Sequence, residues 1–353
     1  MILARRSSIV ISLATGLSFL ALAFAQTLGL QVRTASAADN QTIQGSGATF
    51  PAPLYQRWFQ EYNKVHPEVQ INYQAIGSGA GIKQFQQGLT DFGASDAAMT
   101  DEQIAATKNG VQLIPMTAGI IVLTYNLPGA PNNLKLSREA YSGIFLGKIT
   151  SWNDPAIAKS NPNVQLPDTK ITVVSRSDGS GTTFVFTSHL SGISDAWKSG
   201  PGNGTTVSFP VGVAGKGNPG VTALVKQTPG AIGYVEYAYA YQNKMPMASL
   251  ENKSGSFVAP SLQAGQEALS GVKLPSNLRA WIPDPPAAKS YPIVTYTWML
   301  FHKKYDDPKV AATLKAIALY GLTQGQSFGA TLGYIPLPES VVTEDKKALA
   351  NIS

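Results

Sequence analysis

The stretch SRSDGSGTT, at residues 175–183, places glycine and small hydroxyl residues where an apolar strand gives way to a helix. Two earlier stretches repeat the pattern: GSGATFPAP at 45–53, and IGSGAG at 76–81 followed by DFGASD at 91–96. A helix N-terminus presents unpaired N–H groups and the positive end of the helix dipole, so several directed at one point form an anion site. One arginine and two carboxylates lie within the stretches: Arg176, Asp96 and Asp178. The stretches therefore predict a site for a small oxyanion that still carries a proton.

Strands and helices alternate around these stretches. Residues 69–76 alternate apolar and polar side chains as a strand does, and a helix is predicted over 80–89. A second strand, 92–95, leads to Thr100-Asp101-Glu102-Gln103, which has the spacing of a capping box. Such alternation predicts helices packed on a mostly parallel sheet. The chain beyond its first 38 residues, about 315 residues, exceeds what one core usually organises, so two lobes are expected.

Two of the predicted helices have a regular apolar face. In the helix that follows Pro51 and Pro53, the apolar positions three or four apart are Leu54, Trp58, Tyr62 and Val65. In the helix over 80–89 they are Ile82, Phe85 and Leu89. This spacing places each set on one side of its helix, and Trp58 and Tyr62 are interpreted as core residues rather than ligand contacts.

Four further stretches extend the pattern over the rest of the chain. They are FLGKITSWNDPAI (145–157), KGNPGV (216–221), PGAIGYVEYAYA (229–240) and LGYIPLPESV (332–341). With the three glycine-rich stretches, this ordered set over some 300 residues resembles the periplasmic phosphate-binding proteins of bacterial ABC phosphate importers, the PstS family. The resemblance implies a monomeric solute-binding protein that captures inorganic phosphate and delivers it to the membrane subunits of an importer and their ATPase subunits. It implies no metal and no organic cofactor.

The resemblance also implies a two-lobed α/β fold of the type II solute-binding class, with the ligand in the cleft between the lobes. Two long apolar stretches, 113–127 and 292–301, would then be the hinge strands. Lobe one would combine residues 39–115 with 293–353, and lobe two would span 116–292. The cleft is expected to close on its ligand by a domain motion.

The site residues carried over by the resemblance come from all three glycine-rich stretches. The predicted phosphate contacts are Thr49, Phe50, Ser78, Asp96, Arg176, Ser180, Gly181 and Thr182. Asp178 is predicted to hold the guanidinium fork of Arg176, which fits two oxygens of an oxyanion. Thr183, next in line, has no ligand role in the resemblance.

Asp96 is the most diagnostic of these residues, because a carboxylate beside an anion is repulsive unless a proton lies between them. Inorganic phosphate near neutral pH still holds a proton, because it has one more O–H than a phosphomonoester, whose second ionisation lies near ~6. Sulfate holds none, so an ionised Asp96 would exclude it. The alternative reading makes Asp96 the cap of the next helix, and Ser78 has the same alternative at its own helix.

The N-terminus has the pattern of a secretory signal peptide, residues 1–38. Arg5 and Arg6 precede an apolar run that reaches about residue 24, and small residues follow with cleavage expected after Ala37 or Ala38. Ser7-Ser8-Ile9 matches the twin-arginine signal poorly, which favours an ordinary positive n-region. The run falls short of the ~20 residues that a membrane span needs. The chain has no cysteine for lipid attachment, so a soluble periplasmic protein is expected.

Composition and motifs argue against other classes of protein. Removing Arg5, Arg6 and Arg33 with the signal leaves 24 Lys and Arg against 21 Asp and Glu, so the net charge is near +3. The charges form no run of like sign, and this small, mixed charge argues against nucleic-acid binding. No stretch has the GxxxxGK[ST] pattern of a nucleotide-binding loop. The three histidines, His66, His189 and His302, are too scattered for a metal site.

The remaining alternative is a phosphomonoesterase built on a phosphate-binding scaffold. A serine hydrolase would need a base beside Ser180 or Ser78. His189 follows Thr182 by seven residues and would therefore lie about 10 Å along the same helix, beyond hydrogen-bond reach. The sequence thus predicts a binding protein rather than an enzyme.

Overall fold

The computed structural model describes residues 40–353, so the predicted signal peptide lies outside the described residues. One mixed sheet of eight strands organises this part of the chain, in the order β2-β1-β3-β11-β4-β8-β6-β7. The strands are β1 (Gln41–Gly47), β2 (Val69–Ala75), β3 (Phe92–Ser95), β4 (Val111–Tyr125), β6 (Thr172–Arg176), β7 (Val213–Gly215), β8 (Ala231–Glu236) and β11 (Val294–His302). A smaller sheet has the order β10-β9-β5 and consists of β5 (Lys135–Leu136), β9 (Ser249–Glu251) and β10 (Phe257–Val258).

The long strand β4 belongs to both halves of the large sheet. Its residues 111–120 pair with β11, whereas residues 121–125 pair with β8. Every residue of β4 except Gln112 is buried, as a strand covered on both faces requires. The change of partner along one strand joins a first sheet half (β2, β1, β3, β11) to a second (β8, β6, β7).

Strand directions divide the sheet in the same way. Strand β1 is parallel to β2 and β3, and β6 is parallel to β7 and β8. In the centre, β11 pairs antiparallel with β3 and β4, and β4 pairs antiparallel with β8. The predicted parallel arrangement therefore holds for the outer strands. It is wrong for the centre, where β4 and β11 run in opposite directions.

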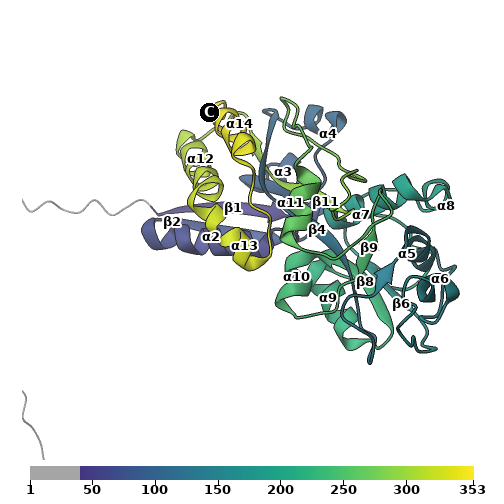
Figure 1. Cartoon of the computed structure of the whole chain (residues 1–353). Coiled ribbons are helices and arrows are strands. Elements are labelled where there is room, and N and C mark those ends of the chain that lie inside the picture. The colour runs from purple at the N-terminus through teal and green to yellow at the C-terminus, as the bar shows by residue number, and fades with distance from the viewer. Residues whose placement is uncertain (1–39) are drawn as a thin grey trace, which may run out of the picture. The chain divides into compact units, whose positions relative to one another are not determined.

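Helices cover the sheet on both sides (Figure 1). Their bounds are α2 (Ala52–Val65), α3 (Ser78–Gln86), α4 (Asp101–Ala105), α5 (Arg138–Phe145), α6 (Pro155–Ala158), α7 (Gly181–Ile193), α8 (Asp195–Ser199), α9 (Gly217–Gln227), α10 (Tyr237–Gln242), α11 (Leu262–Leu269), α12 (Pro308–Leu322), η1 (Gln324–Phe328), α13 (Gly329–Leu332) and α14 (Glu339–Ala350). The C-terminal helices α12 and α13 pack against α2, so the end of the chain returns to the first sheet half.

The predicted local elements are largely confirmed. Strands β2 and β3 lie where the alternation placed them, and Thr100 and Gln103 form the predicted capping box of α4. Helix α3 begins two residues earlier than predicted, at Ser78, because Gly77 turns the chain with a φ of 96°. It ends at Gln86, before Gly88, whose φ of 68° breaks the helix.

Two residues of the predicted apolar faces are exposed. Trp58 and Tyr62 are buried in the core as predicted, but Val65 is 67% exposed and Leu89 is 65% exposed. Val65 is the last residue of α2, and Leu89 lies beyond the end of α3. The prediction fails at Leu89 because the helix has already ended, and at Val65 because the core does not cover the last residue of α2.

Candidate functional site

Arg176 ends strand β6 and presents a fixed guanidinium. Its Nε donates to Oδ1 of Asp178 over 2.8 Å and its Nη2 donates to Oδ2 over 2.5 Å. The side chain of Arg176 is only 1% exposed, and its Nη1 has no hydrogen-bond partner within residues 40–353. Burial raises the pKa of Asp178, but the hydrogen bonds and charge of Arg176 outweigh it and hold that pKa below its ordinary value. The pair thus leaves one buried, charged donor unpaired.

The N-terminus of α7 supplies donors beside this pair. The Oγ of Ser180, the N-cap residue, accepts the N–H of Thr183 over 3.0 Å. The N–H groups of Gly181 and Thr182 precede the first intrahelical bond and find no acceptor among the described residues. The N–H and the hydroxyl of Thr183 are both engaged, because the N–H bonds Ser180 and the hydroxyl bonds the hydroxyl of Tyr234 over 2.7 Å. This agrees with its omission from the predicted site.

Thr49, at the start of α2, meets the N-terminus of α9. Its Oγ1 accepts the backbone N–H of Asn218 over 3.1 Å and the side-chain Nδ2 of Asn218 over 2.9 Å. The same Nδ2 donates to Oγ1 of Thr182 over 3.2 Å. The preceding residue of α9, Gly217, donates its N–H to Oδ1 of Asp178 over 2.9 Å. Asn218 therefore joins the first and third glycine-rich stretches.

Phe50 lies beside Thr49 and is fully buried. Its carbonyl oxygen accepts the hydroxyl of Tyr334 over 2.7 Å, and its ring packs against Gly119 of β4. The N–H of Phe50 precedes α2 and has no acceptor in the described part of the chain. Only this backbone group is left for a ligand, as expected for an apolar side chain in an anion site.

Asp96 is buried at the end of β3 and faces the same point. Its Oδ1 accepts the hydroxyl of Thr297 over 2.9 Å, and its Oδ2 lies 3.5 Å from the Oγ of Ser78. The Oγ of Ser78 also accepts the N–H of Asp96 over 3.2 Å. Burial raises the pKa of Asp96 from 3.8 to about 7, against the hydrogen bond from Thr297 and the charge of Arg176. A carboxyl in this state can exchange a proton near neutral pH.

The alternative roles of Ser78 and Asp96 as helix caps do not fit the geometry. The N-cap position of α3 is Gly77, which has no side chain, and Ser78 is the first helical residue. The N-cap residue of α4 is Thr100, whose side chain accepts the N–H of Gln103. The carboxylate of Asp96 accepts no backbone N–H of α3 or α4 in the described part of the chain.

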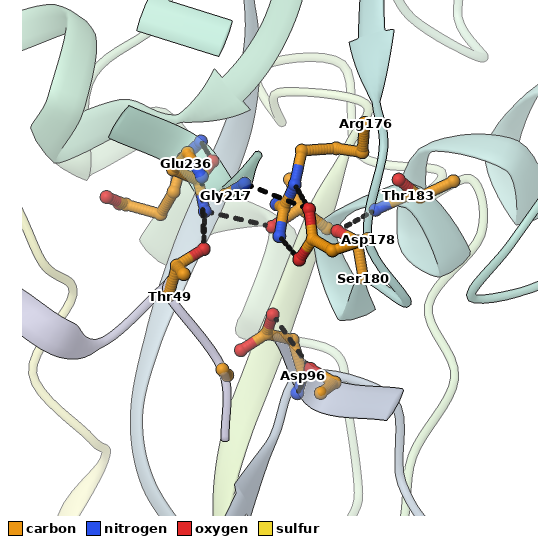
Figure 2. A network of polar contacts seen from close by, with 12 residues as sticks. Thr49, Asp96, Arg176, Asp178, Ser180, Thr183, Gly217 and Glu236 are labelled. Atoms are coloured by element: carbon orange, nitrogen blue, oxygen red, sulfur yellow. Dashed lines mark hydrogen bonds and ion pairs between the residues drawn. The ribbon is translucent and has the colours of Figure 1, made fainter. Parts of the chain in front are cut away.

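The three stretches meet in close contact. A Cβ added to Gly181 would lie 2.5 Å from the Oγ of Ser78 and 2.6 Å from Oδ2 of Asp96. The N–H of Gly79 donates to the carbonyl of Gly179 over 2.9 Å. A side chain is excluded at position 181, and one at position 179 would lie only 3.2 Å from the Cα of Gly79, so both glycines let the helix N-termini approach each other. Figure 2 shows Asp96 facing the Arg176–Asp178 pair, with Thr49 to one side.

The structure thus brings all eight predicted contacts and Asp178 into one cluster. Sequence reasoning missed three residues that hold the cluster in place: Asn218, Thr297 and Glu236. Asn218 lies in KGNPGV, where a glycine and a polar residue open a helix, and Glu236 follows the apolar strand AIGYV directly. Both signals were present in the sequence. Thr297 lies within an apolar strand and carries no local signal.

The histidine side chains are engaged in packing and hydrogen bonds within the fold. His189 is fully buried, where it bonds the hydroxyl of Tyr141 over 2.8 Å and the carbonyl of Pro283 over 2.6 Å, and burial lowers its pKa to about 4. His66 stacks on Tyr62, and His302 stacks on Phe85. Among residues 40–353, no group of three or more His, Cys, Asp and Glu side chains is arranged to hold a metal ion. None of the helices in this range has the length and apolar character to cross a membrane.

Comparisons with known proteins agree with one another. A family model for the PBP superfamily domain matches residues 32–320. The phosphate-binding protein PstS of Pasteurella multocida is 42% identical over 86% of this chain and 88% of its own length. The phosphate-binding protein PstS of Haemophilus influenzae is 40% identical over 90% of this chain and 95% of its own length.

Solved structures give the same fold. A high-affinity periplasmic phosphate-binding protein with bound phosphate superposes with a TM-score of 0.69 at 19% identity, over 86% of this chain and 92% of its own. A phosphate-binding protein from Stenotrophomonas maltophilia superposes with a TM-score of 0.67 at 21% identity, over 87% and 93%. These likenesses show the two-lobed α/β fold of periplasmic solute-binding proteins. With the sequence identities above, the chain belongs to the PstS family of phosphate-binding proteins within the PBP superfamily.

Proposed function

We propose that this protein binds inorganic phosphate at the described cluster and delivers it to an ABC importer in the inner membrane. The observation that carries the proposal is the unpaired Nη1 of Arg176, buried and held by Asp178 close to the protonatable carboxyl of Asp96. A buried charged donor without a partner costs free energy unless an anion occupies the site. The PstS relatives are named as phosphate-binding proteins, which supports the binding part of the proposal.

The donors around Arg176 suit a tetrahedral oxyanion. Three kinds of group supply hydrogens to the oxygens of the anion. They are Nη1 of Arg176, the N–H groups of Phe50, Gly181 and Thr182, and the hydroxyls of Thr49, Ser78, Ser180 and Thr182. Three helices, α2, α3 and α7, begin at the cluster and direct the positive ends of their dipoles to it. Asp96 accepts the one proton that phosphate retains near neutral pH. Sulfate has no such proton, so an ionised Asp96 excludes it.

We infer that the site binds without catalysis. The Oγ of Ser180 caps α7 and lies beside no histidine, since His189 is held by Tyr141 and Pro283. The carboxyl of Asp96 faces the centre of the cluster, and its Oδ1 is already bonded to Thr297. A phosphomonoesterase would require a nucleophile and a base within hydrogen-bond reach of each other.

The lobes are proposed to consist of residues 39–115 with 293–353, and of 116–292. The exchange of partners along β4, from β11 to β8 after residue 120, supports a boundary close to the proposed one. Each lobe then contributes four of the predicted contacts. Lobe one contributes Thr49, Phe50, Ser78 and Asp96, and lobe two contributes Arg176, Ser180, Gly181 and Thr182. Ligand capture proceeds by closure of the lobes about β4 and the segment that leads into β11.

The proposed carrier is a monomer that acts in the periplasm after its signal peptide, residues 1–38, has been removed. Its partners are the membrane subunits of the importer, which work with ATPase subunits. The basis for this setting is the N-terminal signal pattern and the absence of cysteine for a lipid anchor.

The experiment is a paired test of binding and turnover on the mature chain. Radiolabelled phosphate is expected to co-elute with the protein in equilibrium gel filtration, whereas p-nitrophenyl phosphate is expected to remain intact over hours. Steady release of nitrophenol that is abolished by Ser180→Ala would replace the carrier function with phosphomonoesterase activity. Failure to bind phosphate would refute both.

A further inference from the structure

Asn218 is a fully buried residue with every polar group engaged, and neither the sequence motifs nor the proposed ligand set accounts for it. It is the second residue of α9. Its side chain lies between Thr49, which follows β1 in the first sheet half, and Thr182, which follows β6 in the second. It is therefore placed to act on both sides of the cluster at once.

The orientation of the Asn218 amide is fixed. Its Oδ1 accepts the backbone N–H of Glu236 over 2.9 Å, and a backbone N–H can only donate. The Nδ2 group must therefore face Thr49 and Thr182. Glu236 is itself held in place, because its Oε2 accepts the N–H of Ala238 at the start of α10.

This orientation decides what the two hydroxyl groups can do. A hydroxyl has one hydrogen to donate and two lone pairs to accept. Thr49 receives hydrogens from both N and Nδ2 of Asn218, so both of its lone pairs are occupied. Thr182 receives one from Nδ2. Neither hydroxyl has another acceptor among the described residues, so the hydrogen of each is left for the bound anion.

We propose that Asn218 is a positioning residue that makes the hydroxyls of Thr49 and Thr182 donors to the anion and prevents Thr49 from accepting its proton. The proposal rests on the phosphate site described above and deepens it. With Thr49 unable to accept, Asp96 has one competitor fewer for the anion's O–H, so Asn218 contributes to selectivity without touching the ligand. The shared Nδ2 also ties Thr49 to Thr182 when the two sheet halves are together.

The test uses calorimetric titration of inorganic phosphate into the mature protein. Asn218→Leu keeps the approximate volume but donates nothing, and is expected to weaken phosphate binding by about 10- to 100-fold, the scale of one or two lost hydrogen bonds. Asn218→Asp keeps the shape and the Glu236 contact, but its second oxygen accepts hydrogens from both threonines and adds a negative charge. It is expected to weaken binding more than Asn218→Leu does.

A double-mutant cycle separates positioning from a general effect on α9. In a Thr49→Val background, the effect of Asn218→Leu is expected to shrink at least about threefold, because one of the groups through which Asn218 acts is already gone. The matched control is Thr222→Val, which removes the bond from the Thr222 hydroxyl to the carbonyl of Asn218 on the same helix. Phosphate affinity of this control is expected to stay within about twofold of the parent.

Each failure has a distinct meaning. A parent protein that does not bind phosphate refutes the proposed function itself. A parent that binds, with Asn218→Asp binding as tightly as the parent, refutes the role of Asn218. Equal effects of Asn218→Leu in the parent and Thr49→Val backgrounds also refute it, because additivity shows that Asn218 does not act through Thr49. Thermal unfolding of each ligand-free variant verifies that it folds, and the near-isosteric Asn218→Asp decides the matter if Asn218→Leu does not.

Discussion

Replacing Asp96 with Asn changes one buried group from an acceptor into a donor without changing its size. In the parent, Oδ1 of Asp96 accepts the Thr297 hydroxyl over 2.9 Å, and Oδ2 lies beside the Oγ of Ser78, with the N-terminus of α7 close by. In Asp96→Asn the amide oxygen keeps the contact with Thr297. The amide nitrogen then takes the place of Oδ2 and directs hydrogens toward the anion.

The structure sets the scale of the effect. Burial raises the pKa of Asp96 from 3.8 to about 7, and a difference of about three pKa units corresponds to about 4 kcal/mol. That figure is an upper bound on how strongly the ligand-free fold disfavours the carboxylate. The binding free energy of phosphate should weaken by about 1–3 kcal/mol, because its O–H no longer has an acceptor. The binding free energy of sulfate should improve by about 1.5–3 kcal/mol, because the site gains a donor and loses a charge repulsion. The phosphate-to-sulfate affinity ratio should therefore fall at least about 60-fold.

The assay is calorimetry with both anions at one pH and one salt concentration. The matched control is Asp345→Asn, which removes another buried carboxyl with a raised pKa, on α14, with no bond to any cluster residue. Its phosphate-to-sulfate ratio should equal that of the parent. An unchanged ratio in Asp96→Asn would mean that selectivity resides elsewhere and that the raised pKa of Asp96 has no part in it.

Three further predictions concern the arginine, the buried acid on α14 and the lobes. Arg176→Lys keeps the charge but loses the fork that Asp178 orients, so calorimetry should show phosphate affinity lower by about 1.5–3 kcal/mol; unchanged affinity would exclude Arg176 as a direct ligand. Burial raises the pKa of Asp345 to about 8, so the folded chain holds this proton more tightly than the unfolded chain does. The free energy of unfolding should therefore fall between about pH 4 and about pH 8, by up to about 1.4 kcal/mol per pH unit, and urea titrations of Asp345→Asn should show a shallower fall. Because the predicted contacts come from both lobes, small-angle scattering should show a smaller radius of gyration with phosphate; no compaction would argue for a site that is already closed or lies in one lobe.

The parts of the site that could be predicted from the sequence are those that depend on local chemistry. Ser180 followed by Gly181 and Thr182 opens a helix because a hydroxyl cap and a glycine suit that position wherever they occur. The strand that leads to Asp96, β3, could also be predicted from its local sequence. The resemblance to a known family then joined stretches that local reasoning could only find one at a time.

The parts that could not be predicted depend on pairing between distant segments. Asn218 meets Thr49 across 169 residues, and Thr297 meets Asp96 across 201. No local pattern marks Thr297, because a threonine in an apolar strand is equally suited to packing. The antiparallel centre of the sheet was missed for a related reason, since the direction of β11 is set by where the chain returns rather than by its own residues. At Leu89 the error was of the opposite kind, because a helical period was extended past the helix end, and at Val65 the apolar face was extended to a last helical residue that the core does not cover.

The central claim is that the cluster around Arg176 and Asp96 is a phosphate site that requires the ligand's proton. Calorimetric titration of the mature, ligand-stripped protein with phosphate and then with sulfate, at neutral pH, tests it most directly. We expect saturable one-to-one binding of phosphate and no measurable heat with sulfate at the same concentrations. Binding of both anions with similar affinity, or of neither, would contradict it.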